Sequence, residues 1–348
     1  MKFFLARFNQ IREDNNPKKS WSKIIKEVIT LSIQNKRIPT YYVKTFMYLE
    51  SSGNYKDFLT LDEIIAINSS PKLHRLEYTT LLKNKLASAL YFEKCGLSIP
   101  EMPSYNVEKL FFHKSKFERL ETTADLIQFF RKVMQESQKD SLFLKDHGAH
   151  GGADCFLLKL GDLEAKLEEI EPILLNGSFI HQETVLQHAE LNKIYGHSLN
   201  TMRFETYIDR DNKKHIRTCY IRFGANGSVI DNSSAGGIGV PVNIETGQLY
   251  EKGFKRASGL NMANIYLEHP NSEHPFEGFI IPHFEAAKQL VFDCMKFVPD
   301  RYIGWDVAIA ANGPVLIEGN GSPRLRESPH GFKSSAIGRE ILNEIYSK

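Results

Sequence analysis

The segment from residue 304 to residue 323, GWDVAIAANGPVLIEGNGSP, constrains the fold most strongly, because it has the pattern of a β-hairpin with acids inside its strands. Two apolar runs rich in β-forming residues flank an Asn-Gly pair, which is a strong hairpin signal. Glu318 and Asn320 are two residues apart, so a strand places both side chains on one face. The face that Asp306 occupies depends on the length of the turn.

Two turn lengths give opposite answers for Asp306. A two-residue Asn-Gly turn would place Asp306 on the face opposite to Glu318. A three-residue turn over residues 311–313 would pair Asp306 directly with Glu318, with β-carbons about 5 Å apart. We expect the three-residue turn. Two carboxylates this close repel, so one of them should resist ionisation unless a cation lies between them.

The polar face of this hairpin has two interpretations. Two carboxylates and an amide oxygen are hard ligands of the kind that Mg²⁺ takes together with phosphate oxygens. The alternative is an ordinary surface hairpin whose polar face meets water. The segment alone leaves both open.

The rest of the chain predicts an α+β fold. The N-terminal part is rich in lysine and carries helical apolar spacing. The segment 77–105 predicts one helix that ends at Gly96 and is followed by extended chain. From residue 141 onward, short apolar strands alternate with turns rich in Gly, Asn and Asp, and helices return near the C-terminus. The expected parts are a helical N-terminal region, a first lobe and a second lobe, at residues 1–78, 79–182 and 183–348.

Within the N-terminal region, the segment WSKIIKEVITLSIQ predicts an amphipathic helix. One apolar stripe is expected along it, formed by Trp21, Ile24, Ile25, Val28 and Leu31.

The composition is that of an ordinary soluble enzyme. The 348 residues suffice for two or three packed units, and a net charge of +2 gives no reason to expect a nucleic-acid partner. The four cysteines are widely separated, which fits reduced thiols and no zinc site. No apolar run approaches the ~18 residues that a membrane span requires. We therefore expect a cytoplasmic protein without a membrane span.

A lysine before a glycine-rich segment is a candidate phosphate site. Lys145 ends the apolar run SLFLK directly before DHGAHGG, which contains Gly148, Gly151 and Gly152. Backbone amides in such a segment can approach phosphates closely, and the ammonium group adds positive charge. The spacing is not that of a P-loop, so a flexible turn is the alternative. Lys85, in a helical segment, is on its own equally consistent with a solvated lysine.

The segment SLNTMRFETY predicts a strand with two distinct faces. Two sets of residues should alternate between the faces, Asn200, Met202, Phe204 and Thr206 on one and Thr201, Arg203 and Glu205 on the other. Arg203, next to Glu205, belongs either to a structural ion pair or to an anion site.

The order of these features along the chain resembles the ATP-grasp superfamily, and most closely the sugar-transfer-associated ATP-grasp family linked to cell-surface polysaccharide synthesis. The similarity covers roughly residues 35 to 340. Its most specific parts are the segments SLNTMRFETY and IGWDVAIAANGPVLIEGNGSP. The resemblance implies an ATP-grasp fold, in which two α+β lobes clasp ATP.

The resemblance also implies roles for individual residues. Lys85 and Lys145 would bind ATP, with Lys145 at the phosphates, and residues 148–152 would close over them. Arg203 would act with Lys145 on the transferring phosphate. The implied metal-binding residues are Asp306, Glu318 and Asn320.

The adenosine end of ATP would lie against a hinge between the lobes. Its backbone would hydrogen-bond adenine, and one glutamine would lie near the ribose. The implied residues are Gln182, Glu183, Thr184, Val185 and, at the ribose, Gln187.

The resemblance implies an ATP- and Mg²⁺-dependent ligase that joins a small-molecule carboxylate to an amine through an acyl phosphate. The substrates would be small molecules, some of them sugar-linked. The alternatives are a kinase with the same nucleotide site and a nucleotide-binding module without turnover. The sequence identifies neither substrate.

Overall fold

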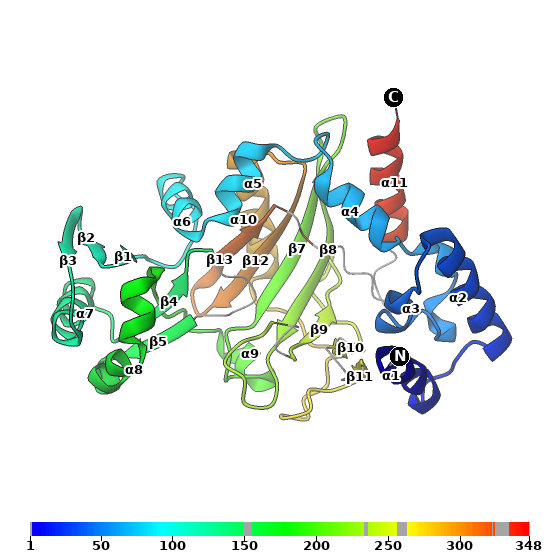
Figure 1. Ribbon diagram of the computed structural model, residues 1–348, viewed down its shortest axis with the longest axis horizontal. Helices are drawn as coiled ribbons and strands as arrows, with labels where there is room; N and C mark the ends of the chain where they lie inside the picture. The colour runs from blue at the N-terminus through cyan, green and yellow to red at the C-terminus, as the bar shows by residue number, and fades with distance from the viewer. Residues whose placement is uncertain are drawn as a thin grey trace.

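The structure is a computed structural model that describes residues 2–148, 155–232, 236–255, 263–321, 323 and 334–347, without the side chains of residues 2–7 and 334–337. Two antiparallel sheets and their surrounding helices confirm the expected α+β fold. Figure 1 shows the first sheet at one end of the molecule, the second sheet in the middle and the N-terminal helices at the other end.

The N-terminal region is helical, as expected. A small apolar core joins its first three helices to the β10–β11 edge of the second sheet, where Phe254 packs against Phe46. The helices are α1 (Lys2–Glu13), α2 (Trp21–Asn35), α3 (Thr40–Lys44) and α4 (Leu61–Ser69), with the short 3₁₀ helices η1 (Glu50–Ser52) and η2 (Tyr55–Asp57) between α3 and α4.

The single helix expected within residues 77–105 is wrong, because the chain forms two helices that meet at Asn84. These are α5 (Leu76–Lys83) and α6 (Lys85–Lys94). The backbone of Asn84 is extended, and its side chain accepts a hydrogen bond from the amide of Ala87, so Asn84 caps the second helix. Lys85 consequently becomes the first residue of a helix.

The first sheet contains the strand that carries Lys145. Its strand order is β3-β2-β1-β6-β4-β5, and β4 forms as expected from the apolar run SLFLK. The core of this sheet is completed by two helices, α7 (Thr123–Ser137) and α8 (Leu163–Asn176). The 3₁₀ helix η3 (Leu160–Asp162) precedes α8. The strands are β1 (Ser104–Val107), β2 (Leu110–His113), β3 (Lys116–Arg119), β4 (Ser141–Asp146), β5 (Cys155–Lys159) and β6 (Ser178–Glu183).

The second sheet has one apolar and one polar face at its centre. Met202 and Phe204 lie in the core, whereas Thr201 and Arg203 line a cavity, which confirms the predicted alternation. Its order is β11-β10-β9-β8-β7-β12-β13. The strands are β7 (Thr201–Ile208), β8 (Lys214–Phe223), β9 (Ile238–Pro241), β10 (Gly253–Lys255), β11 (Asn264–Tyr266), β12 (Tyr302–Ala310) and β13 (Gly313–Asn320).

Three further helices cover this sheet. The apolar face packs against α10 (Phe284–Phe297), whose buried side chains join the same core as Trp305. Beside this core lies α9 (Ala189–Ile194), which contributes Leu191 and Ile194. Near the C-terminus, α11 (Ser334–Tyr346) packs with α4 against Tyr207 and Tyr302.

The β12–β13 hairpin reaches the expected register by an unexpected route. Asp306 pairs with Glu318, as predicted, but Ala310 pairs with Gly313, so the turn has two residues and the expected three-residue turn is wrong. A β-bulge lies between these pairs, since Val307 pairs with Leu316 and leaves one extra residue in β13. The extra residue is therefore in the strand rather than in the turn.

A buried histidine connects two strands of the first sheet. His181 is fully buried, and its ring nitrogens lie 2.8 Å from the hydroxyl of Ser104 and 3.0 Å from the side-chain oxygen of Asn106. Burial, and to a lesser extent the nearby His147, lowers the pKa of His181 to about 3. The folded protein therefore holds this histidine neutral.

This pKa predicts a loss of stability in mild acid. The unfolded chain takes up the proton below about pH 6.5 while the folded chain resists, so the free energy of unfolding should fall by about 2 kcal/mol between pH 6.5 and pH 5. Urea unfolding of His181→Gln should show a correspondingly weaker dependence on pH than the wild type. Equal pH dependence of both proteins would contradict this assignment.

Candidate functional site

A cavity of about 240 Å³ lies where the first sheet, the second sheet and α6 meet. Strands β4, β5 and β6 contribute from the first sheet, and β7, β8, β12 and β13 contribute from the second. The structure brings seven of the predicted site residues to this cavity. They are Lys85, Lys145, Gln182, Arg203, Asp306, Glu318 and Asn320.

One buried carboxylate holds two arginines on the polar face of the second sheet. Arg203 binds both oxygens of Asp306, through Nε and, at 2.9 Å, through Nη2. Arg222 Nη2 lies 3.1 Å from Asp306 Oδ2. The three residues come from the neighbouring strands β7, β8 and β12, and the alternation of side chains places all of them on one face.

This arrangement keeps Asp306 ionised. Burial alone would raise its pKa, but Arg203 and Arg222 lower the pKa of Asp306 to about 2. One of the two paired carboxylates was expected to resist ionisation, and for Asp306 this expectation is wrong. The two guanidinium groups supply the positive charge that the sequence alone suggested a metal ion would supply.

Arg222 and Asp231 are site residues that the sequence interpretation missed. Arg222 Nε lies 3.5 Å from Asp231 Oδ2, and the same carboxylate oxygen accepts a hydrogen bond from the amide of Thr201 at 2.8 Å. The available signal was a charged residue between two apolar residues in the strand segment CYIRF. Arg222 reaches the site because β8 pairs with β7, and the local sequence pattern does not show this pairing.

The two predicted lysines also line the cavity. Lys85 Nζ lies 3.9 Å from Glu318 Oε1, and the Lys85 amide donates to the carbonyl oxygen of His147 at 3.0 Å. That hydrogen bond fastens the start of α6 to the chain that leaves β4. Because helix N-termini favour anions, the first turn of α6 adds to the positive charge of the lysine.

Lys145 stands on β4 beside an aromatic ring. Its Nζ lies 5.6 Å from the centre of the Phe143 ring. Desolvation in the cavity lowers the pKa of Lys145, and the charge of Glu318 partly opposes this effect. A bound anion would favour the charged form of this lysine still further.

The predicted adenine and ribose residues are only partly at this cavity. Gln182 lines it, and its buried Oε1 has no hydrogen-bond partner among the described residues, which leaves an acceptor for a ligand. Within the described residues, the other predicted positions do not line the cavity. They are Gly148, Glu183, Thr184, Val185 and Gln187. Gly151 and Gly152 lie outside the described residues.

Two of those side chains already have structural partners. Glu183 binds Lys139 at 2.6 Å, and Gln187 donates to the carbonyl oxygen of Tyr195 at 3.0 Å. Their predicted contacts with a nucleotide stay predictions, and for Glu183 to Val185 they concern the backbone.

The oxygen ligands expected for magnesium differ in how accessible they are. Both oxygens of Asp306 already accept from guanidinium groups, so a metal ion would have to replace one of these contacts. The side chain of Glu318 is 29% exposed and faces the cavity with Asn320. Among the described residues, no group of three or more His, Cys, Asp and Glu is arranged to hold a metal. The site therefore fits a metal ion held jointly by Glu318, Asn320 and a phosphate-bearing ligand.

Comparison with known families gives a match over most of the chain. Residues 67–331 match the family described as sugar-transfer associated ATP-grasp. No curated protein matches the chain.

Solved structures with a similar arrangement share little sequence. D-alanyl-alanine synthetase A from Vibrio cholerae is 14% identical, with a TM-score of 0.44 over 78% of this chain and 67% of that protein. VanG D-Ala:D-Ser ligase from Enterococcus faecalis is 11% identical, with a TM-score of 0.44 over 77% and 62%. The ATP-grasp ligase PsnB is 13% identical, with a TM-score of 0.42 over 79% and 63%. The chain thus spans about two thirds or less of the length of these proteins.

Removal of the shared carboxylate should destabilise the protein. Asp306→Asn leaves two buried guanidinium groups close together without their common counter-charge, so we expect the free energy of unfolding to fall by about 3 kcal/mol at pH 7. Because the pKa of Asp306 is lowered from 3.8 to about 2, the wild-type advantage should be complete above pH 4 and vanish towards pH 2. Urea unfolding across this pH range would measure it.

An exposed ion pair supplies the control. Asp62 pairs with Arg37, and both side chains are largely exposed. Asp62→Asn should therefore cost less than about 1 kcal/mol. An equal loss of unfolding free energy in the two variants would show that Asp306 stabilises the protein no more than an exposed ion pair does.

Proposed function

The chain belongs to the sugar-transfer-associated ATP-grasp family, and from this premise we propose that it is an ATP-dependent ligase that joins a carboxylate to an amine. The ATP-grasp fold is typical of ATP-dependent ligases. The observation that carries the proposal is the distribution of charge around the cavity. Two lysines, one on β4 and one on α6, line the same cavity as two buried arginines of the second sheet.

Such a site suits phosphoryl transfer, which depends mainly on positioning and on charge stabilisation. Lys85, Lys145 and the N-terminus of α6 would bind the ATP phosphates. Glu318 and Asn320 would hold Mg²⁺, whose charge offsets that of the phosphates when it is bound. Gln182 and the backbone of residues 183–185 would bind adenine, with Gln187 near the ribose, and the glycine-rich residues 148–152 would cover the phosphates.

The proposed reaction has two steps. A substrate carboxylate attacks the γ-phosphorus, which forms an acyl phosphate and releases ADP. The amine then attacks the acyl carbon, forms the amide, and releases inorganic phosphate and a proton. Arg203 would stabilise negative charge on the transferring phosphate, while Arg222 would hold Asp306 and thereby orient Arg203.

The family description supports a finer proposal about the substrates. An association with sugar transfer fits an acid or amine that is sugar-linked, within cell-surface polysaccharide or related glycan or peptide biosynthesis. A uronic acid or an amino acid would supply the carboxylate.

Loss of the ammonium group at Lys145 should affect ATP far more than adenosine. We expect Lys145→Ala to weaken ATP binding at least tenfold, because a charge-assisted contact to phosphate contributes about 1.5–3 kcal/mol. Adenosine binding should change little. Calorimetric titration of both ligands measures the difference, with Lys132→Ala, an exposed lysine of the first lobe, as the matched control. Equal weakening of both ligands would place Lys145 elsewhere than at the phosphates.

Turnover assays test the ligase proposal directly. With Mg²⁺ and ATP, release of ADP and phosphate should require both a carboxylate and an amine, and an amide should be the product. A stable phosphorylated product would indicate a kinase instead. Absence of ATP hydrolysis with every acceptor, despite ATP binding, would indicate a binding module.

Glu318→Gln should lower this turnover by about 100-fold or more while the fold is retained, because Gln fills the same space without the charge. Its melting temperature without ligand should change little, because the Lys85–Glu318 contact that it loses is long and partly exposed. The gain in melting temperature with Mg·ATP should be smaller. Glu168→Gln, at an exposed position in α8, is the control. Normal turnover by Glu318→Gln would overturn its proposed role.

A further inference from the structure

Helix α2 carries an apolar stripe that points away from the protein. Four side chains recur at every fourth position, which places them on adjoining faces of a helix. They are Trp21, Ile25, Ile29 and Ile33, with 43%, 54%, 53% and 73% of their surface exposed. The ring of Phe8 extends the patch, because it lies 5.4 Å from the ring of Trp21 and is also exposed.

The opposite side of α2 is already packed. Ile24, Glu27 and Leu31 are buried against the rest of the N-terminal region. Glu27, the one acid of this helix, binds Lys19 at 3.0 Å and accepts a hydrogen bond from Tyr42 at 2.6 Å. The predicted single stripe is therefore split, since two of its members face inward and Trp21 and Ile25 face outward. Tertiary packing accounts for one side of α2 and leaves the other free to contact a partner.

Positive charge accompanies the outward stripe. Lys23 and Lys26 are exposed on α2, and Lys36 is exposed at its C-terminal end. Residues 1–44 contain ten of the 44 lysines and arginines but three of the 42 acids, so they carry a net charge of +7 while the rest of the chain carries −5. A charge asymmetry of this size between parts of one chain points to an anionic partner.

We propose that α2 binds the surface of an anionic lipid bilayer, with its axis in the plane of the membrane. The isoleucines would enter the boundary between head groups and acyl chains, Trp21 would lie at the interface, and the lysines would contact anionic head groups. A nucleic-acid backbone offers no apolar partner for this stripe. A second copy of the chain would bring the same lysines into mutual repulsion.

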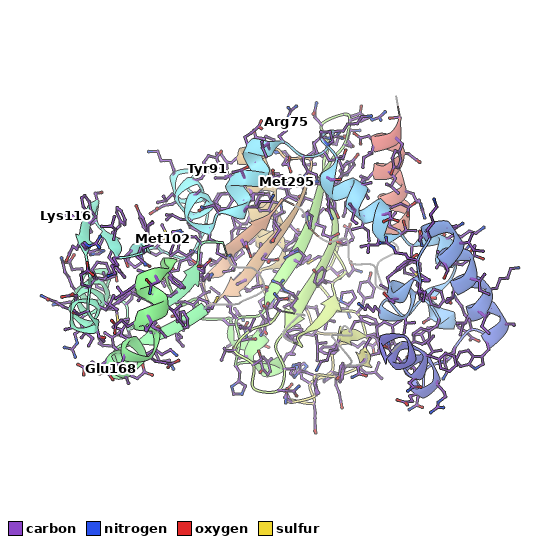
Figure 2. All side chains as sticks on the ribbon, in the orientation of Figure 1. Arg75, Tyr91, Met102, Lys116, Glu168 and Met295 are labelled. Carbon is purple, nitrogen blue, oxygen red and sulfur yellow. The ribbon has the colours of Figure 1, made fainter. Side chains whose placement is uncertain are left out.

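The position of α2 permits this contact. Figure 2 shows the N-terminal helices at the end of the molecule opposite to Lys116 and Glu168, which belong to the first lobe. A membrane against α2 would leave the first lobe facing away from the lipid. None of the described helices is both long enough and apolar enough to span a bilayer, and the proposal requires only peripheral binding.

Vesicle co-sedimentation tests the proposal. We expect the full chain to pellet with vesicles of phosphatidylcholine containing 30 mol% phosphatidylglycerol, and to pellet far less with phosphatidylcholine alone. Binding should fall several-fold from 0.1 M to 0.5 M NaCl, because salt shortens the screening length from about 10 Å. The combined variant Ile25→Ser, Ile29→Ser, Ile33→Ser should lower the partition coefficient at least tenfold. A second variant, Lys23→Gln with Lys26→Gln, should lower it several-fold.

A matched control separates this surface from general exposure of apolar groups. Leu76→Ser, Phe117→Ser and Ile280→Ser change three other apolar residues that are each more than 60% exposed, and their combination should bind like the wild type. Circular dichroism would verify that every variant is folded. Wild type that binds neither vesicle, or isoleucine variants that bind normally, would overturn the proposal. A dimer in sedimentation velocity that the isoleucine variants abolish would also overturn it, in favour of self-association.

Discussion

The polar face of the second sheet depends on one buried carboxylate that is shared by two guanidinium groups. Asp306 lies on β12, and its partners Arg203 and Arg222 lie on the next two strands, β7 and β8. Without this charge, two buried cations would lie side by side in a medium of low dielectric constant, which is costly. The backbone makes room for the arrangement, because a β-carbon on Gly304 would come within 3.1 Å of the Arg203 side chain.

The other side of the cavity is organised by backbone rather than by charge. The hydrogen bond from the Lys85 amide to His147 joins the start of α6 to the end of β4, so the two lysine-bearing elements hold a fixed relation. The positive charges around the cavity come from β4, α6 and the second sheet. A ligand with several negative charges would thus be bound by elements of both sheets at once.

The sequence predicted those features that depend on local periodicity. The alternation around Arg203 follows from the spacing of two along a strand, and the strand before Lys145 follows from its apolar run. The pairing of Asp306 with Glu318 was expected from a three-residue turn, whereas it forms through a two-residue turn and a bulge. Features that depend on which strands become neighbours were not predictable. Arg222 belongs to the site because β8 pairs with β7, and the outward stripe of α2 is exposed because the fold buries its other side.

Two differences between expectation and structure have different physical origins. Asn is a favoured helix N-cap, so the break at Asn84 had a local signal, and the hydrogen bond from Lys85 to His147 reinforces it from outside the segment. The charge state of Asp306 is decided by two arginines on other strands, which a local pattern does not show.

The bulge in β13 has a consequence for how such a hairpin can vary among related chains. Eleven residues separate Asp306 from Glu318, and the one that does not pair can lie either in the turn or in the strand. A chain with a three-residue turn and a regular β13 would bring the same two carboxylates opposite each other. Insertion of a residue in the turn together with removal of the bulge would therefore keep the two carboxylates opposite each other. Hairpins whose turns differ in length by one residue can thus carry the same pair of site residues.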